Sequence, residues 1–508
     1  MSITETITKQ KKDHKAEQKQ IKREYIFRNA SPWKAIFKMV LPTIIAQLIV
    51  ASYQVIDKII ATNFGTSYVI ETYSHMGTIN VETARTIINI ATGYAGVVSA
   101  ITFAFSLLVS IGTSIKCSIA MGQKNEQLIK DNVGTGIILS LTLAVVLSIV
   151  MWFLALPIIE FQASLKTGGQ AWEKQIIIQE ALNYSRIIIV GVVLLFGANF
   201  WIMLFRSEGR IITIILINLS GCLINIILDF SLVEKWGMIG TAYPTLIAWC
   251  FYIICALIVV YKSKSHFQIG WKNLKFKWKL AISILALGFA SLLENIAQAL
   301  IIMTTARLLH NLPEPQVDNH QISVYVSLSS GIAPWLVILN APIIGLGYGA
   351  RSLVGYAYGQ RNFKRIWHYM SRLFILLLAM LAMLVLIVII FGQHMLMIFG
   401  VSESIAQTFK IYIIMQFAFY PLATFSYMAI ILFQSTNHPK LALFSSIQRT
   451  IVMPTICLTL GFFVATWFQE GFYYYLFVGF IDLLASFILI PLLIGTIYKN
   501  RRFVFKLK

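Results

Sequence analysis

The chain has 508 residues, of which 58% are hydrophobic and only 12% are charged, and its mean hydropathy is +0.75. Soluble proteins carry roughly 25% charged residues, so this composition excludes a soluble globular enzyme. A formal net charge of +20 would suit nucleic acid in a soluble protein, but here the basic residues cluster between apolar runs and at both ends, without zinc-ligand spacing.

The first 33 residues are polar and rich in Lys. They contain neither the apolar core nor the small-residue cleavage site of a signal peptide. We therefore expect residues 1–33 to be an uncleaved, basic cytoplasmic tail that is in part helical.

Twelve apolar runs follow, each close to the roughly 20 residues that span a bilayer. Because lipid cannot satisfy open backbone groups, each run is expected to be a helix, which makes the chain an all-α polytopic membrane protein. The segment 63–91 between the first two spans is long and has no interpretation from sequence. The expected span cores are 36–60, 91–117, 133–157, 181–205, 211–233, 239–261, 280–305, 322–348, 367–391, 406–432, 442–466 and 472–497.

The Lys and Arg residues between spans are far more numerous on the side of the N-terminus than on the opposite side. Cytoplasmic loops carry this excess in membrane proteins. The count is even, so both termini are expected in the cytoplasm of a multi-pass protein of the cell membrane, with 499–508 as a second basic tail.

Two segments repeat each other at one constant offset: 112–125 reads GTSIKCSIAMGQKN and 349–362 reads GARSLVGYAYGQRN. A weaker echo relates the LFRS of 204–207 to the LFQS of 432–435. The repeat divides the chain into an N-lobe (34–265) and a C-lobe (280–498), two pseudo-symmetric six-helix bundles of parallel topology. Such repeats are typical of transporters, with the site near the repeat interface. Residues 266–279 are basic and aromatic, and we expect an amphipathic interfacial linker, a helix in the headgroup layer.

Asp57 and Asp229 each lie about 28 Å along a span that starts on the N-terminal side, so they share one level of the membrane. Asn225 is one turn before Asp229, and Thr245 comes early in the next span, near the same level. Two carboxylates, an amide and a hydroxyl could bind Na⁺, or the carboxylates could share a proton. The alternative is that both acids are interfacial residues near helix ends.

Glu294 and Asp482 form a second pair of acids near mid-depth in the C-lobe, where a charge is costly enough to suggest function. They could line a second cavity. They could equally be satisfied by Asn295, Gln298 or Arg449, which would make them structural. Both alternatives remain open from sequence.

Several segments together resemble the multidrug and toxic compound extrusion (MATE) transporters. These are LPTIIAQLIVASYQVIDKII in the first span, NIILDFSLV followed by GMIGTAYPT in the fifth and sixth, the GQKN and GYAYGQRN span ends, and SSIQRTIVMP at the start of the eleventh. The resemblance covers nearly the whole membrane region. It implies twelve helices in two bundles and export of organic, often cationic, compounds driven by inward H⁺ or Na⁺.

The resemblance also implies a cation-coupling site in the N-lobe. The first-helix Asp of one prokaryotic branch matches Asp57, its fifth-helix Asn-x-x-x-Asp matches Asn225 and Asp229, and its sixth-helix Thr matches Thr245. The C-lobe departs from the acid-containing tenth span of another branch. For the substrate cavity we expect aromatic and polar side chains, namely Tyr53, Asn199, Glu294, Tyr412, Gln416 and Tyr420.

We therefore predict a monomeric, cation-coupled (H⁺ or Na⁺) antiporter of organic, cationic compounds, with no cofactor, no structural metal and no nucleic-acid partner. One alternative is a flippase or exporter of a lipid-linked saccharide or other lipid, which should have a strongly basic cavity. Only five basic residues are interior, and we expect them to lie mostly near span ends, which favours export of cations. They are Arg186, Arg307, Arg351, Lys410 and Arg449. An enzyme is disfavoured because no catalytic motif is present, and a channel because the repeat suits a self-contained carrier.

Overall fold

The computed structural model describes residues 18, 20–165, 170–263, 265–268, 270, 274–312, 324–398 and 403–504. Its regular elements in these ranges are all helices, as the apolar runs predicted. A short N-terminal helix covers residues 20–28. The expected tail segments 1–17 and 505–508 lie outside the described residues, whereas the last helix continues into the basic tail as far as Val504.

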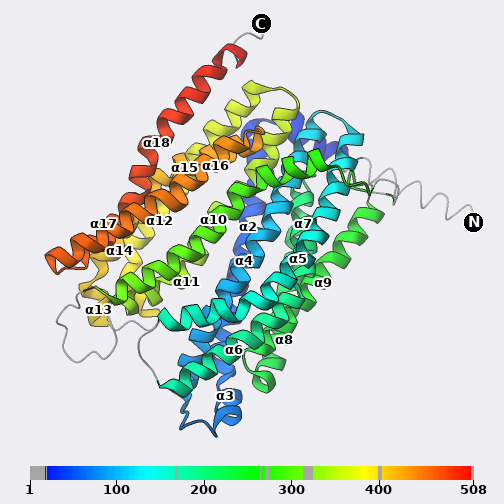
Figure 1. Ribbon diagram of the computed structural model, residues 1–508. Coiled ribbons are helices and arrows are strands. Elements are labelled where there is room, and N and C mark those ends of the chain that lie inside the picture. Colours follow the sequence, from blue (N-terminus) through cyan, green and yellow to red (C-terminus); the bar gives the residue numbers. More distant parts are fainter. Residues whose placement is uncertain are drawn as a thin grey trace, which may run out of the picture.

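The N-lobe contains eight helices, coloured blue to green in Figure 1. They are α2 (Pro32–Phe64), α3 (Thr66–Tyr73), α4 (Val81–Gly122), α5 (Glu126–Leu165), α6 (Ala171–Val190), α7 (Val192–Ser207), α8 (Ile211–Trp236) and α9 (Ile239–Lys262). The C-lobe elements are α10 (Trp278–His310), α11 (Val324–Gly359), α12 (Phe363–Ile398), α13 (Glu403–Thr408), α14 (Lys410–Phe417), η2 (Tyr420–Leu422), α15 (Ala423–Ser435), α16 (Pro439–Ile447), η3 (Gln448–Val452), α17 (Met453–Phe468) and α18 (Phe472–Val504).

The described residues contain 11 spans that are long and apolar enough to cross a membrane, and a twelfth if the bent pair α6–α7 is one span. The two helices of that pair meet at 56° around Gly191. A Cβ atom at position 191 would lie 2.7 Å from the Leu246 side chain, so the bend brings backbone against α9 where only glycine fits. The predicted twelve spans are thus present, with the fourth one bent.

The tenth and eleventh spans are interrupted helices. Between α14 and α15 the chain passes through the 3₁₀ turn η2, which contains Pro421. In the eleventh span the π-helical segment Gln448–Val452 precedes Pro454. Proline lacks an N–H and clashes with the preceding turn, and π-helical segments in α-helices are often found at functional sites.

The repeated motif is a matched pair of helix ends. Lys124 and Arg361 both adopt a left-handed backbone, with φ of 56° and 55°. In each copy the following Asn closes the turn onto the preceding helix and then caps the next one: Asn125 Oδ1 accepts from Leu128 N at 2.9 Å, and Asn362 Oδ1 accepts from Arg365 N at 3.0 Å. The two copies therefore share their backbone conformation as well as their sequence.

The lobes pack closely at one end of the bundle, which we call the N-terminal end because α2 begins there. The repeated glycines meet at this end: a Cβ on Gly122 would lie 3.0 Å from the Cα of Gly359. A Cβ on Gly288 of α10 would overlap the Leu108 carbonyl of α4. One hydrophobic cluster joins the lobes there, from Ala35 to Ile431.

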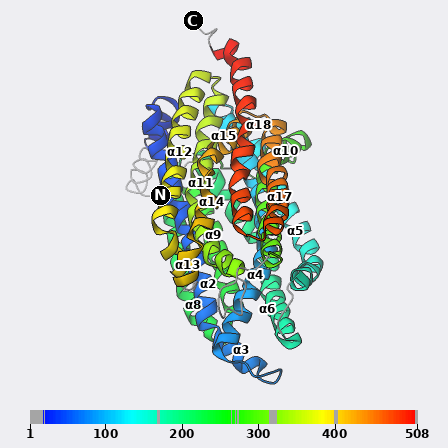
Figure 2. The same cartoon turned by 90° about the vertical axis from the view of Figure 1, so that its left-hand side faces the viewer.

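Towards the other end, the far end, the two lobes have separate cores. One cluster there is built almost entirely from N-lobe residues, and another lies wholly in the C-lobe. Figure 1 shows the corresponding divergence of the ribbons, with α6 and α8 on one side and α13 and α17 on the other. Figure 2 shows α3 at the tip of the N-lobe. The packing is therefore that of a two-lobed protein closed at its N-terminal end.

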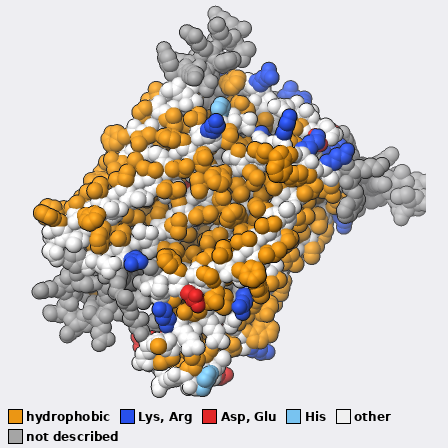
Figure 3. Space-filling view, viewed as in Figure 1, with side chains coloured by type: hydrophobic (Ala, Val, Ile, Leu, Met, Phe, Trp, Pro, Cys, Tyr) orange, Lys and Arg blue, Asp and Glu red, His pale blue; other side chains and the backbone are white. Residues whose placement is uncertain are grey.

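The outer surface is strongly apolar. Large hydrophobic side chains such as Phe153, Ile212 and Trp467 are more than 70% exposed. Figure 3 shows hydrophobic side chains over most of one face, with Lys and Arg gathered at its upper right. An apolar band flanked by basic residues suits a lipid environment.

The expected amphipathic helix between the lobes is not formed by the described residues of this linker. Residues 265–268, 270 and 274–277 are non-helical, while 269 and 271–273 lie outside the described residues. Lys277 N donates to Thr135 Oγ1 at 3.3 Å, Thr135 Oγ1 donates to Lys275 O at 3.3 Å, and Lys277 Nζ pairs with Asp131 at 2.5 Å. These side-chain bonds hold the backbone extended instead of helical.

The long segment after the first span folds into α3, a loop and the first turns of α4. Asn80 caps α4 by accepting from Thr83 N at 2.8 Å. The Tyr73 hydroxyl donates to Glu180 Oε1 at 2.7 Å, and burial together with that carboxylate raises the pKa of Tyr73. The segment is thus a structured cap over the far end of the N-lobe.

Candidate functional site

The four N-lobe residues singled out from sequence lie together in the structure. Asp57 comes from α2, Asn225 and Asp229 from α8, and Thr245 from α9. With its amide oriented to satisfy its neighbours, Asn225 Nδ2 donates to Asp57 Oδ1 at 2.8 Å, while Asn225 Oδ1 accepts from Thr245 N at 3.2 Å. The carboxyl groups of Asp57 and Asp229 are within hydrogen-bonding reach of each other.

Asp229 is the most buried member of the group, with 0% of its surface exposed. Neither carboxylate oxygen has a hydrogen-bond donor among the described residues. A buried carboxylate without a donor is costly, and a second carboxyl group beside it adds repulsion. The arrangement therefore favours a proton or a bound cation between the two acids.

Three tyrosines surround the acid pair. Tyr53 lies one turn before Asp57 on α2, and Tyr184 and Tyr252 approach from α6 and α9, each as an electrostatic neighbour of Asp57. The Tyr252 ring also blocks any side chain at Gly221 of α8. The acid pair thus lies among tyrosine side chains, with Asp229 buried and Asp57 partly exposed.

The polar groups of these four residues are two carboxylates, an amide and a hydroxyl. No cluster of three or more His, Cys, Asp or Glu side chains that could hold a metal ion occurs in the described ranges. Hard oxygen ligands without a soft donor suit H⁺ or Na⁺ better than a transition metal.

The remaining residues expected around a substrate fall in separate places. Asn199 Nδ2 donates to Ser106 Oγ at 2.8 Å inside the N-lobe. Tyr420 OH donates to Asn340 Oδ1 at 2.6 Å inside the C-lobe. Tyr412 belongs to an aromatic cluster with Tyr325 at 6.4 Å, and Gln416 lies one turn further along α14, half-buried.

The second pair of acids, Asp482 and Glu294, lies around Arg449. Asp482 forms an ion pair with Arg449, whose Nε donates to Asp482 Oδ1 at 3.0 Å. The Arg449 guanidinium also covers the Tyr427 ring at 4.2 Å. Glu294 is an electrostatic neighbour of Arg449 and of Arg351 instead. Of the two alternatives left open, the structural one fits Asp482.

The sequence did not single out Arg206. The expectation that interior basic residues lie mostly near span ends also does not hold at the lobe interface. Arg206 is 3% exposed, and its guanidinium covers the Tyr348 ring at 4.5 Å. Arg351 covers the same ring at 5.8 Å from within the C-lobe. The LFRS echo placed Arg206 at a helix end, but only the packing of the other lobe reveals its burial.

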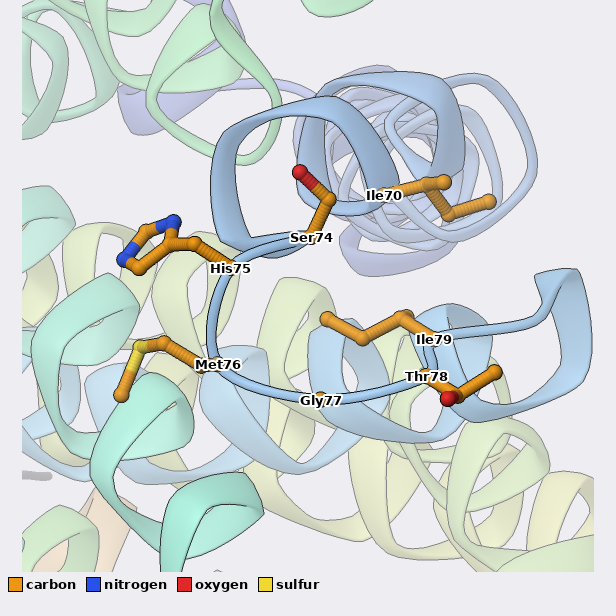
Figure 4. Close-up of a pocket in the computed structure, with 7 residues that line it drawn as sticks. All are labelled: Ile70, Ser74, His75, Met76, Gly77, Thr78 and Ile79. Atoms are coloured by element: carbon orange, nitrogen blue, oxygen red, sulfur yellow. The ribbon is translucent and has the colours of Figure 1, made fainter.

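A shallow pocket lies in the cap at the far end, apart from the acid pair. Figure 4 shows its lining, the loop between α3 and α4 with the side chains of Ser74, His75 and Met76 projecting from it. Its lining carries no group of convergent charged side chains. The pocket therefore has fewer charged groups that could bind a ligand than the acid pair or the lobe interface.

The model of the MatE family matches residues 91–231 and 286–459, together more than half of the chain. The chain belongs to the MATE family of transporters. The two matched stretches fall one in each lobe, as the internal repeat requires. As a member of the MATE family, it is a polytopic α-helical membrane protein with a two-lobe fold.

Curated relatives of this MATE transporter are distant. An uncharacterized homologue of protein MG447 from Mycoplasmoides gallisepticum is 25% identical over 314 residues, 55% of this chain and 53% of that protein. The probable multidrug resistance protein YoeA of Bacillus subtilis is 22% identical over 275 residues, 52% of this chain and 55% of that one. The chain thus spans about half the length of these relatives.

Solved structures share the fold. An outward-facing multidrug resistance MATE transporter of the MOP superfamily aligns with a TM-score of 0.78 at 19% identity, covering 94% of this chain and 98% of that one. A MOP superfamily transporter from Pyrococcus furiosus aligns equally well, with the same TM-score, identity and coverage. At this identity the likeness establishes the two-lobe architecture and not the substrate.

Proposed function

We propose that this MATE transporter is a cation-coupled antiporter that exports organic compounds, driven by inward movement of H⁺ or Na⁺. The observation that carries the proposal is the buried Asp229 carboxylate, which lies beside Asp57 and accepts no hydrogen bond from the described residues. A charge that deep inside a membrane protein is costly and marks an ion path. Binding of one cation between the two acids removes the repulsion between their carboxylates. We therefore expect the occupancy of this cation site to be linked to the arrangement of the two lobes.

The pair is well placed to bias the lobes. Asp57 lies on α2, whose N-terminal half packs against α11 of the C-lobe: a Cβ on Gly345 would lie 2.7 Å from the Cα of Ile44. A shift of α2 on cation binding would therefore be felt at the contact between lobes. We place the N-terminal end of the bundle, and with it both chain termini, on the cytoplasmic side of the cell membrane. We also propose that a monomer is sufficient for transport.

A flippase or exporter of a lipid-linked saccharide or other lipid remains the second candidate, because Arg206, Arg351 and Arg449 are buried inside the bundle and are not at span ends. The transporter from Pyrococcus furiosus is described as having a binding pocket of reverse polarity that suggests a different function. The expectation of a cationic substrate rests on the family resemblance and on the aromatic residues, and the buried arginines are the observation that favours an anionic one.

The test is gradient-driven efflux from liposomes. Reconstituted protein would be loaded with ethidium, an organic cation, or with 1-naphthyl phosphate, an organic anion, and challenged with a pH gradient and then a Na⁺ gradient. Efflux that needs one gradient names the ion and the preferred charge. Transport of labelled lipid without any gradient dependence would favour the flippase.

A further inference from the structure

The lobe interface contains a buried positive charge, Arg206, that forms no ion pair with a carboxylate of the described residues. Arg206 donates from Nη1 to the Met203 thioether at 3.3 Å, and its Nε has no hydrogen-bond partner in the described part of the chain. A thioether is a weak acceptor. The Arg206 guanidinium also covers the Tyr348 ring at 4.5 Å, a cation–π contact that stabilises a charge whose insertion into a membrane is costly.

A second guanidinium lies on the same ring. Arg351 Nε donates to Gln434 Oε1 at 2.6 Å, and Glu294 is its acidic neighbour. Because Glu294 is also the neighbour of Arg449, while Asp482 is already paired, three arginines face two acids in this region. The excess positive charge resides at Arg206, on the N-lobe side.

The two arginines come from different lobes, and this decides when they are accessible. Arg206 lies on α7, whereas Tyr348 and Arg351 lie on α11, and all three are in the part of the interface that is packed in this structure. A separation of the lobes at the N-terminal end would break the cation–π contact between Arg206 and Tyr348 and leave one arginine on each side of the opening.

We infer that Arg206 and Arg351 form a binding site for an oxyanion, a phosphate or carboxylate group of the transported compound, which is occupied when the lobes part at the N-terminal end. Two planar guanidinium groups are suited to bidentate recognition of such groups. The inference rests on the proposed alternating access and narrows its substrate class to anionic or zwitterionic organic compounds, in place of the purely cationic ones expected from sequence.

A matched pair of probes tests this site. 1-Naphthyl phosphate and 1-naphthylmethylammonium share one ring system and carry opposite charges, and their dissociation constants would be measured by fluorescence titration of the protein in nanodiscs. Nanodiscs of phosphatidylcholine alone and nanodiscs that contain phosphatidylglycerol separate a soluble phosphate from a lipid headgroup as the source of the anion. Competition by phosphatidylglycerol would identify the headgroup as a ligand, and no competition would identify a soluble one.

The variants are Arg206→Gln, Arg206→Lys and, as control, Arg186→Gln, whose exposed guanidinium covers Trp152 at 5.5 Å on the surface of the same span. We expect Arg206→Gln to weaken binding of the phosphate probe about tenfold or more, because a partner of a buried charge is removed. Arg206→Lys should retain part of the affinity for the phosphate probe, because lysine keeps the positive charge but lacks the planar, bidentate guanidinium group. The control and the ammonium probe should not change.

Unchanged binding of 1-naphthyl phosphate in Arg206→Gln would overturn the inference, as would tighter binding of the ammonium probe in the wild type. If Arg206→Gln does not fold, Arg351→Gln and Arg206→Lys decide in the same way. The two proposals fail separately. Gradient dependence that survives in Asp57→Asn would contradict the proposed ion coupling, whereas unchanged phosphate binding in Arg206→Gln would contradict only the oxyanion site.

Discussion

Arg206 and Gln434 occupy equivalent positions in the two lobes, as the third residues of LFRS and LFQS. Gln434 Nε2 donates to Leu287 O and to Ser291 Oγ, both at 3.0 Å, and so stays satisfied within its lobe. Arg206 instead reaches the Tyr348 ring of the opposite lobe. The two copies of the repeat thus have equivalent positions with different side chains. Gln434 is a structural residue within its own lobe, whereas the environment of Arg206 depends on contact with the other lobe.

Asn225 orients the Asp57 carboxylate, so Asn225→Ala should weaken cation coupling without unfolding the protein. Loss of an orienting neighbour typically costs 10–100-fold in ion affinity, and we expect about tenfold here. The measurement is the cation concentration that gives half-maximal efflux from liposomes. A variant with wild-type cation dependence would show that Asn225 serves only to pack α8 against α9.

The ion pair of Arg449 and Asp482 is structural, so breaking it should cost stability. Removing one partner of a buried pair leaves an uncompensated charge, which typically costs about 3–5 kcal/mol. Asp482→Asn should therefore lower the thermal unfolding temperature measured in detergent. The double variant Arg449→Gln/Asp482→Asn should recover part of the loss, whereas equal loss in single and double variants would argue against pairing.

Gly288 permits the tight contact with the Leu108 carbonyl that closes the N-terminal end. Gly288→Val cannot be accommodated there and should shift the protein towards a state that is open at this end. Gly96→Val is the matched control, because nothing lies within 4 Å of a Cβ at that position. Both changes place the same residue in a helix.

The opening is measured as the distance between spin labels at Glu126 and Lys364, two exposed residues at the starts of α5 and α12. The labels would be introduced after replacing the exposed Cys250. We expect a longer mean distance in Gly288→Val and no change in Gly96→Val. Identical distance distributions in both variants would mean that this contact does not control closure.

Tyr73 gives the buried Glu180 its hydrogen bond at 2.7 Å, and Glu180 Oε2 has no partner among the described residues. Tyr73→Phe removes that donor and should destabilise the cap by about 1–3 kcal/mol. Faster hydrogen exchange in α3 alone would report this local effect. Unchanged exchange there would show that Glu180 is satisfied in another way.

The sequence predicted what depends on periodicity and on helix-end chemistry. Apolar runs identified the twelve spans, and the GQKN and GQRN motifs located two turns that proved to share left-handed backbone at Lys124 and Arg361. Equal depth brought Asp57 and Asp229 into one layer, because helical rise converts residue number into position along the membrane.

Contacts between the lobes could not be predicted from periodicity or from helix-end residues. The burial of Arg206 depends on α11, more than a hundred residues away in sequence, and a helix-end arginine ordinarily reaches water. The helix expected from the amphipathic composition of the linker is absent from its described residues for a related reason: Thr135 and Asp131 of α5 bind its backbone and its Lys277 side chain.

The central claim is that Asp57 and Asp229 bind the coupling cation, and cation-dependent stability tests it without knowledge of the substrate. Thermal unfolding would be followed in the wild type, Asp57→Asn, Asp229→Asn and the exposed control Glu82→Gln, with Na⁺ exchanged for choline at constant ionic strength and with pH lowered separately. We predict that Na⁺ or lower pH stabilises the wild type and the control, and that both Asp variants lose this response. An equal response in all four proteins would contradict the account.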